Sequence, residues 1–189
     1  MAKKRSIRIA GGRYRGRGLE YPSERILRPT MGRTREAVFN VLGDEVRGAV
    51  FVDLFAGGGA VGIEALSRGA AEVHFVEKDS EVVAYLRGNL ERLGVTADQA
   101  RVHQMDVEAF LAHDLAAPGQ LVYADPPYET GAARIVVAHF SQTRYPALRR
   151  LVVEHRGELE APGGSLRLDQ EKRYGDTLVS FFVPEETTA

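Results

Sequence analysis

The sequence predicts an α/β protein in which helices cover both faces of a mostly parallel sheet, and three observations support this prediction. From residue 49 onward, short apolar segments of strand length alternate with segments of helical periodicity. Several of the short segments end at a carboxylate, which places acidic side chains along one rim of the expected sheet. A glycine-rich loop joins the first of these strands to its helix. We therefore expect one domain of this class in the 189 residues, preceded by a small extension.

The extension is expected to form a β-hairpin. Residues 6–21 contain two short segments punctuated by glycines, and arginines recur along them, so the hairpin would have a basic face. A helix is expected at about 33–45, with Gly43 or Gly48 ending it. Its apolar face consists of Ala37, Val38, Val41 and Leu42. We accordingly divide the chain into an extension, 1–32, and an α/β domain, 33–189.

Strands and helices alternate after this first helix. The strands are expected at residues 50–54, 73–76, 101–105, 120–124 and 151–154. The helices are expected at about 60–68, 80–93, 107–112 and 131–141. The tail predicts two more strands, near 165–169 and 177–183. Because no long helix separates these two, they should form an antiparallel hairpin at one edge of a seven-stranded sheet.

The composition excludes several classes of protein. Apolar residues make up 44% of the chain, which is too many for a disordered protein. No apolar run approaches the ~18 residues that a membrane span needs. The chain has no cysteine, which excludes disulfides and thiolate sites, and its five histidines show no metal-ligand spacing. We expect a cytoplasmic monomer that binds neither a membrane nor a metal ion.

Charge is distributed unevenly along the chain. Residues 1–35 contain eleven Lys and Arg against two acidic residues, a net charge of +9, and the remaining residues carry −10. A basic arm on an acidic body suits a polyanionic partner, although a solvated basic tail is the simpler alternative. We expect a nucleic acid to contact this arm. The candidate RNA-binding residues are Arg8, Arg13, Arg15, Arg17, Arg28, Arg33 and Arg35.

The glycine-rich loop at residues 53–62 predicts a cofactor site. Gly57, Gly59 and Gly62 satisfy the pattern Gly-x-Gly-x-x-Gly, which alone is weak evidence for dinucleotide binding, so a nicotinamide-dependent oxidoreductase stays an alternative. Asp53 opens the loop with a carboxylate, which would repel a pyrophosphate. The same carboxylate suits a cofactor with a sulfonium charge and an amino group, as in S-adenosylmethionine.

Further acids follow the next strands. Glu77 ends the second strand, where an acid can accept both ribose hydroxyls of either cofactor. Asp106 follows the third strand, where it could accept from an adenine amine while Val107 contacts the ring, or could cap the following helix. The expected cofactor-binding residues are Asp53, Phe55, Ala56, Gly57, Gly59, Glu77, Lys78, Asp106 and Val107.

A second loop, Asp125-Pro126-Pro127-Tyr128, follows the fourth strand directly. Four specified residues arise by chance in a chain of this length with odds on the order of one in a thousand. The loop could be only a rigid turn, since proline fixes φ. Its chemistry favours catalysis, because the Asp125 carboxylate and the Pro126 carbonyl can hold both hydrogens of a conjugated amine and direct its lone pair toward a methyl group. Tyr128 can stack on a base taken out of its helix. We expect all four residues to be catalytic.

These motifs resemble those of known methyltransferases. Residues 53–62 resemble the first motif of class I methyltransferases, and residues 125–128 resemble the Asp/Asn-Pro-Pro-Tyr motif of amino-methyltransferases. Residues 8–17, 27–30 and 33–42 are similar to the N-terminal signature of the RsmD family, whose members methylate N2 of one guanine in 16S ribosomal RNA. The resemblance covers about residues 7–183.

The resemblance implies a Rossmann-like class I methyltransferase with a seven-stranded sheet and an N-terminal hairpin for RNA. It implies S-adenosylmethionine as the cofactor. It also implies 16S rRNA in the small ribosomal subunit, or in its assembly intermediate, as the substrate. Cofactor roles are carried over to Asp53, Gly57, Gly59, Glu77 and Asp106, and catalytic roles to Asp125, Pro126 and Tyr128.

Three alternatives stay open on the residues alone. The Asp125–Tyr128 loop suits adenine N6 in DNA or RNA, or a glutamine amide, as well as guanine N2. The Gly-x-Gly-x-x-Gly pattern would serve an oxidoreductase. The basic hairpin could belong to an RNA-binding module without catalysis.

Overall fold

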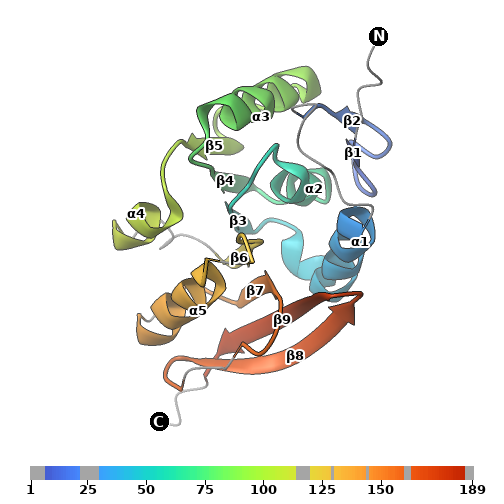
Figure 1. The fold of residues 1–189 in the computed structure, drawn as a ribbon. Helices are drawn as coiled ribbons and strands as arrows, with labels where there is room; N and C mark the ends of the chain where they lie inside the picture. The colour runs from blue at the N-terminus through green and yellow to red at the C-terminus, as the bar shows by residue number, and fades with distance from the viewer. Residues whose placement is uncertain are drawn as a thin grey trace.

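The computed structural model of the chain describes residues 7–21, 30–113, 120–128, 130–143, 145–159 and 163–185. Seven strands form one sheet in the order β5-β4-β3-β6-β7-β9-β8 (Figure 1). They are β3 (Val50–Leu54), β4 (Glu72–Val76), β5 (Ala100–His103), β6 (Leu121–Ala124), β7 (Arg150–His155), β8 (Leu166–Tyr174) and β9 (Thr177–Pro184). The first five are parallel, and the last two form the antiparallel edge hairpin that the sequence predicts.

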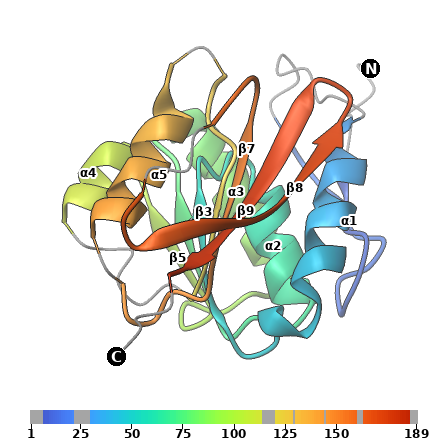
Figure 2. The same cartoon turned by 90° about the horizontal axis from the view of Figure 1, so that it is seen from below.

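Helices cover both faces of this sheet (Figure 2). They are α1 (Thr30–Leu42), the 3₁₀ turn η1 (Gly43–Val46), α2 (Ala60–Ser67), α3 (Ser80–Leu93), α4 (Val107–Ala112) and α5 (Ala132–Gln142). One core cluster joins one sheet face to α1, α2 and α3 through residues such as Phe39, Ile63 and Leu86. The other joins the opposite face to α4 and α5 through Phe110 and Val137. The predicted two-sided α/β class is therefore confirmed.

The sheet has a topological switch point between β3 and β6. From β3 the chain adds β4 and β5 on one side, and it then returns to add β6 and β7 on the other. In such sheets the loops at the carboxyl ends diverge at the switch point and leave a crevice for ligands. The loops that follow β3 and β6 are the two that the sequence predicts to be functional.

Two predicted element boundaries were wrong. The first helix runs from Thr30 to Leu42, three residues earlier than expected, and crosses the predicted boundary between residues 32 and 33. Gly43, with φ of 50°, follows its last residue. Strand β8 extends to Tyr174, well beyond the predicted 165–169. Most of β8 is solvent-exposed at the edge of the sheet, so its residues lack the apolar alternation by which a strand is recognised.

The N-terminal hairpin consists of β1 (Ile7–Arg8), β2 (Gly18–Leu19) and the loop between them. It packs on the helix that follows the glycine-rich loop, because Ile9 and Leu19 are buried in the same core cluster as α1 and α2. The backbone of the hairpin loop approaches the end of α2 so closely that a Cβ at Gly12 would lie 1.8 Å from the carbonyl oxygen of Ser67. Glycine is therefore required at this position.

A buried carboxylate holds the hairpin in place. Glu64 of α2 is fully buried and accepts hydrogen bonds of 2.8 Å from the backbone N–H groups of Ala10 and Gly11. Two guanidinium groups neutralise it: that of Arg68 at 2.8 Å and that of Arg35 at 3.4 Å. The hairpin is thus fixed to the domain by charge and hydrogen bonds as well as by apolar packing.

Candidate active site and nucleic-acid surface

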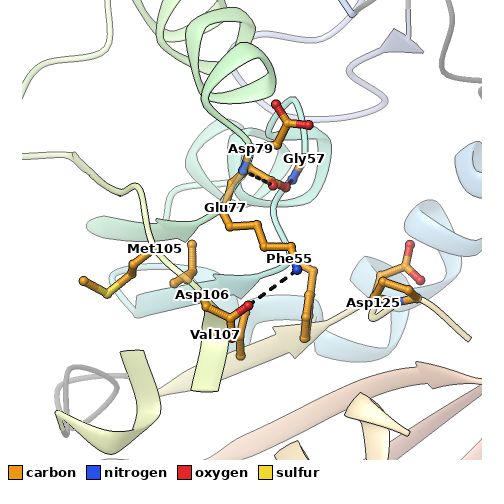
Figure 3. A pocket seen from close by; sticks show the side chains of 11 residues that line it. Phe55, Gly57, Glu77, Asp79, Met105, Asp106, Val107 and Asp125 are labelled. Atoms are coloured by element: carbon orange, nitrogen blue, oxygen red, sulfur yellow. Dashed lines mark hydrogen bonds and ion pairs between the residues drawn. The ribbon is translucent and has the colours of Figure 1, made fainter. Parts of the chain in front are cut away.

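A pocket of about 330 Å³ lies at the carboxyl ends of β3, β4, β5 and β6 (Figure 3). Its lining consists of Phe55, Gly57, Val76, Glu77, Lys78, Asp79, Met105, Asp106, Val107, Asp125 and Pro127. Six of the nine predicted cofactor-binding residues line it. Its position at the switch point of the sheet is that expected of a ligand site.

Two backbone hydrogen bonds fix the carboxylate of Glu77 in the lining of this pocket. Its Oε2 accepts from the N–H of Gly57 at 3.0 Å, and its Oε1 accepts from the N–H of Asp79 at 2.9 Å. Figure 3 shows the carboxylate between these two residues. Each oxygen keeps a second lone pair, so the carboxylate is oriented and still able to accept hydrogen bonds from a ligand.

The loop after β3 carries local backbone strain. Among the described residues, Phe55 is the one non-glycine residue with a positive φ, 62°. Such a conformation costs on the order of 1–3 kcal/mol and is concentrated at functional sites. In Figure 3 the ring of Phe55 lies between Val107 and Asp125. The strained backbone therefore places an aromatic side chain in the lining of the pocket.

Asp53 does not lie in the pocket lining, contrary to the expectation that it contacts the cofactor. Its side chain is 1% exposed, and its Oδ2 accepts from the N–H of Gly62 at 2.8 Å, in the first turn of α2. Burial, together with the nearby charges of Asp125 and Glu77, raises the pKa of Asp53 to about 8. Asp53 is thus largely uncharged at neutral pH. Its hydrogen bond with Gly62 joins β3 to the first turn of α2 and so supports the glycine-rich loop between them.

Ala56 and Gly59 also lie outside the pocket lining. Ala56 is 8% exposed, and its N–H donates to the carbonyl of Val76 at 2.9 Å. Gly59 precedes α2 in the left-handed conformation, and a Cβ there would lie 2.4 Å from a methyl group of Leu86. Both residues shape the loop by packing, and neither presents a side chain to the pocket.

The segment after the hairpin supports the same loop. The Nδ2 of Asn89 donates to the carbonyls of Gly58 at 2.9 Å and Glu20 at 3.0 Å, and its Oδ1 accepts from the N–H of Glu20 at 2.8 Å. The ring of Tyr21 lies directly against Gly58. These supporting residues were not predicted from the sequence, because their role depends on contacts between residues 31 to 69 positions apart along the chain.

The part of the pocket formed by the loop after β5 combines apolar and charged groups. Met105 and Val107 supply apolar surface, and Val107 is 5% exposed. Asp106 caps α4 by accepting from the N–H of Glu108 at 2.9 Å, and its Oδ2 lies 3.5 Å from the Nζ of Lys78. Its capping role and its place in the lining thus occur together. Sequence reasoning missed Val76, Asp79 and Met105, although each lies within two residues of a predicted one.

The electrostatics of the pocket argue against a dinucleotide. Four carboxylates line it against a single lysine, which is itself paired with Asp106. A pyrophosphate would also need the free N-terminus of α2, and a carboxyl oxygen of Asp53 already accepts from Gly62 there. The acidic lining favours a ligand that carries a positive charge.

The loop at residues 125–128 separates this pocket from a second one, of about 240 Å³. Asp125 lines the first pocket, Pro126 and Tyr128 line the second, and Pro127 lines both. The guanidinium of Arg156 lies 4.5 Å from the ring centroid of Tyr128, whose hydroxyl lies 3.4 Å from the Oγ1 of Thr177. The structure thus brings all four predicted catalytic residues to the boundary between two pockets.

The second pocket contains a buried acid that sequence reasoning missed. Glu154, at the end of β7, is 6% exposed and accepts a hydrogen bond from the hydroxyl of Tyr123. Burial and the neighbouring charge of Asp125 raise the pKa of Glu154 to about 8. The signal that identified Asp53, Glu77 and Asp125, an acid at the carboxyl end of a strand, also applies to Glu154.

The arginines of the hairpin are exposed, as expected of a nucleic-acid surface. Arg8, Arg13, Arg15 and Arg17 all face solvent, and three of them make single hydrogen bonds to oxygens of this chain. Arg33 on α1 is exposed as well, whereas Arg28 lies outside the described residues.

Arg35, which the sequence predicts to bind RNA, is buried in the structure. It is 4% exposed, its Nη2 donates to the carbonyl of Arg8 at 2.7 Å, and its Nε faces the buried carboxylate of Glu64. These contacts use the guanidinium to join the hairpin to α1 and α2.

No helix in the described part of the chain is long and apolar enough to cross a membrane.

Comparisons with known proteins agree with this geometry. A family model described as "Conserved hypothetical protein 95" matches residues 7–183. The chain is 44% identical over 125 residues to Ribosomal RNA small subunit methyltransferase D of Escherichia coli, a match that covers 66% of this chain and 62% of that relative. It is 32% identical to the putative rRNA methyltransferase YlbH of Bacillus subtilis, over 93% of this chain and 98% of the relative. The solved structure of the putative methyltransferase yhhF from E. coli superposes with a TM-score of 0.82 at 35% identity, covering 96% and 99% of the two chains.

Proposed function

The chain belongs to the family described as Conserved hypothetical protein 95, and from that premise we propose that it is an S-adenosylmethionine-dependent methyltransferase acting on N2 of a guanine in 16S rRNA. In this proposal the substrate is the small ribosomal subunit or its assembly intermediate, and the enzyme acts on it as a monomer in the cytoplasm. Two relatives, from E. coli and B. subtilis, are named as rRNA methyltransferases.

One observation carries this proposal: the Asp125–Tyr128 loop lies between two pockets. A methyl transfer needs donor and acceptor on opposite sides of the reacting atoms, in line with each other. The first pocket, with its Gly57 and Glu77, is suited to the donor. The second pocket, with its aromatic Tyr128, is suited to a planar acceptor.

The residues of the first pocket fit S-adenosylmethionine, which supplies an electrophilic methyl group when it is bound. The oriented carboxylate of Glu77 can accept hydrogen bonds from ribose hydroxyls. Met105 and Val107 offer apolar surface for an adenine ring, with Asp106 beside them. The four carboxylates of the lining attract a sulfonium charge.

At the boundary, the chain's own groups prepare the acceptor. The Asp125 carboxylate and the Pro126 carbonyl can each accept one hydrogen of an exocyclic amine, and the two prolines fix the direction of both acceptors. Holding both hydrogens out of line leaves the nitrogen lone pair directed toward the donor pocket. As positive charge develops on the amine, the Asp125 carboxylate stabilises it and can take the proton that leaves.

The exposed arginines of the hairpin and of the neighbouring helix α1 provide the RNA contacts. Four of them lie on the hairpin, and Arg33 lies on the neighbouring helix α1. Exposed guanidinium groups contact phosphates at little desolvation cost, and such contacts position a nucleic acid without reading its sequence. The hairpin therefore serves binding, and the choice of base belongs to the second pocket.

The proposal is tested by incubating the protein with radiolabelled S-adenosylmethionine and small ribosomal subunits that lack the modification. Digestion to nucleosides should yield labelled N2-methylguanosine. Label on N6-methyladenosine would replace guanine by adenine as the acceptor. Absence of label on every nucleoside, with the protein folded and S-adenosylmethionine bound by calorimetry, would refute an rRNA methyltransferase.

A further inference from the structure

We propose that Arg134 and Arg156 form a phosphate site at the second pocket, which holds a phosphodiester flanking the target guanosine once its base is turned out of the RNA helix. This inference rests on the proposed function and deepens it. It adds an RNA contact close to the reacting atoms to the contacts expected at the hairpin. Because the ligand is a phosphate of the substrate RNA, the two arginines position the nucleotide and do not read its base.

The loop of the hairpin lies at the opposite end of the sheet from the Asp125–Tyr128 loop. The N–H of Arg13 donates to the carbonyl of Ser67 at 2.8 Å, and its guanidinium donates to the side chain of Gln99. Ser67 precedes β4 and Gln99 precedes β5, so both lie toward the amino ends of the parallel strands. Strand β3, with 5 residues, spans about 16 Å of this separation. Phosphates next to the target base therefore need cations nearer to the second pocket.

Two arginines line the second pocket itself. Arg134 belongs to α5, Arg156 directly follows β7, and both side chains are exposed. Within the described ranges, neither guanidinium forms an ion pair with a carboxylate or a hydrogen bond to an oxygen. Arg150, at the start of β7, instead pairs with Glu45 and Asp169. The pocket thus presents two guanidinium groups whose donors are available to an anion.

Arg156 lies over the ring of Tyr128. Its guanidinium carbon is 4.5 Å from the ring centroid, within the range of a cation–π contact. This contact uses the π-face of the ring and no oxygen acceptor, so the N–H donors can still bind the oxygens of a phosphate. The loop that carries Arg156 is held by the buried ring of His155, which lies 2.8 Å from the Oγ of Ser180 and 3.1 Å from the carbonyl of Gly157.

The two pockets differ in the sign of their charge. The acids of the second pocket are Glu154 and Glu158, and burial raises the pKa of Glu154 to about 8, so this group is largely protonated at neutral pH. Burial also lowers the pKa of His155, which keeps its ring neutral. Two arginines therefore outweigh one exposed carboxylate, that of Glu158. A phosphate is attracted to this lining, whereas the carboxylates of the first pocket attract a cation.

A phosphate contact at this place should act on the extruded state of the nucleotide. Turning a base out of its helix costs stacking and pairing energy, so contacts that form only in the extruded state favour the productive complex. The flanking phosphate moves with its nucleotide and would meet the arginines in that state. We therefore expect the two arginines to affect methyl transfer within the bound particle more than binding of the particle.

The experiment removes the cations and the phosphate charge, separately and together. The guanine that the wild-type protein methylates is mapped first. Small subunits are then assembled from ligated rRNA in which a linkage flanking this guanine is either a phosphodiester or an uncharged methylphosphonate. Both forms carry a 2′-deoxy sugar on the 5′ side of that linkage, which keeps the methylphosphonate stable. The two flanking linkages are tested in turn with wild type and with the double variant Arg134→Ala/Arg156→Ala, at saturating protein in a single turnover.

In wild type, a methylphosphonate at one of the two linkages should lower the rate of methyl transfer by about 10-fold to 100-fold, because charge-assisted hydrogen bonds are lost. The double variant should lose a similar factor on the phosphodiester and at most about twofold more on the methylphosphonate. Its affinity for S-adenosylmethionine should match that of wild type, since neither arginine lines the first pocket. Arg167→Ala, at an exposed position on β8, should keep the wild-type rate and the full methylphosphonate effect.

Two results would overturn the inference. Equal losses from the methylphosphonate in wild type and in the double variant, at both linkages, would leave the arginines only a structural role beside Tyr128. An unchanged rate of wild type on both methylphosphonates would overturn it as well, and this result does not depend on the folding of any variant. Each of these outcomes leaves guanine methylation intact, whereas absence of label on guanine in the wild type with phosphodiester linkages refutes the proposed function instead.

Discussion

The basic hairpin and the acidic rim of the sheet use charge in opposite ways. On the hairpin, the arginines Arg8, Arg13, Arg15 and Arg17 face solvent, where their charge is available to a polyanion. At the rim, Asp53 and Glu154 lie below the surface, and burial raises the pKa of each to about 8. Exposed charge therefore serves long-range attraction, while buried acids exchange their charge for hydrogen bonds with fixed partners.

Each region also contains one charged residue whose exposure is typical of the other region. Arg35 belongs to the basic stretch, yet it is buried against Glu64 and joins the hairpin to the domain. Asp125 belongs to the acidic rim, yet it reaches the surface of the donor pocket. Whether a charged residue acts on a partner or on the fold thus depends on its exposure, and the predictions below test this distinction.

The largest expected effect is that of Asp125→Ala on catalysis. Removing an acceptor that holds the amine and stabilises its developing charge should lower kcat by about 10²-fold to 10³-fold. Binding of the RNA particle, measured by filter retention, should change little. Asp176→Ala, in the exposed turn between β8 and β9, is the matched control and should keep full activity. Activity of Asp125→Ala close to that of wild type would exclude the loop from catalysis.

The next effect separates two arginines on the same helix. Arg35→Ala leaves the buried Glu64 with one guanidinium fewer, and breaking a buried pair in this way should cost on the order of 3 kcal/mol of unfolding free energy. Arg33→Ala, at an exposed position two residues earlier, should change stability by less than about 0.5 kcal/mol. Urea denaturation measures both. A stable Arg35→Ala variant that loses RNA affinity would restore the sequence-based assignment of Arg35.

The third effect is a pH dependence of stability from Asp53. Its pKa is raised from 3.8 to about 8 in the folded state, so the folded protein binds more protons than the unfolded chain between these values. Stability from this group is therefore present at low pH and is lost as pH rises, by at most about 1.4 kcal/mol per pH unit. Asp53→Asn keeps an oxygen for Gly62 and lacks the titration.

Comparing wild type with Asp53→Asn separates the titration of Asp53 from that of Glu154, whose pKa is raised in the same direction. Between pH 6 and pH 7.5, the unfolding free energy of Asp53→Asn should gain about 2 kcal/mol over that of wild type, as measured by urea denaturation at each pH. A difference that stays constant across this range would mean that Asp53 is already ionised.

The contrast between the regions also explains what the sequence could and could not predict. The α/β order, the pocket at the switch point and the position of the Asp125–Tyr128 loop beside it follow from local patterns, such as acids at strand ends and the helical spacing in residues 80–93. The roles of Arg35 and Asp53 do not, because Arg33 and Arg35 are the same residue type on one helix. What distinguishes them is contact with Arg8 and Glu64, at 27 and 29 residues' separation along the chain. Burial of this kind is a property of the tertiary packing.

The smallest expected effect concerns the hairpin itself, and it tests the half of the comparison that depends on exposed charge. Changing Arg13, Arg15 and Arg17 together to Ala should weaken particle binding by roughly tenfold at moderate salt, because each phosphate contact contributes modestly when solvent screens it. The slope of log affinity against log salt should decrease by up to about 2, since each lost contact to single-stranded RNA removes about 0.7.

A variant with the same loss of charge elsewhere makes this a test of position. Arg167, Lys172 and Arg173 are exposed on β8, an edge strand of the seven-stranded sheet, and their joint change to Ala should leave the salt slope unchanged. Because the hairpin is held by Glu64 and by backbone amides, the first variant should fold with the stability of wild type. Equal salt slopes for the two triple variants would mean that net charge, and not the hairpin, attracts the RNA. A salt slope reduced in the hairpin variant alone would place the RNA on the side of the sheet covered by α2.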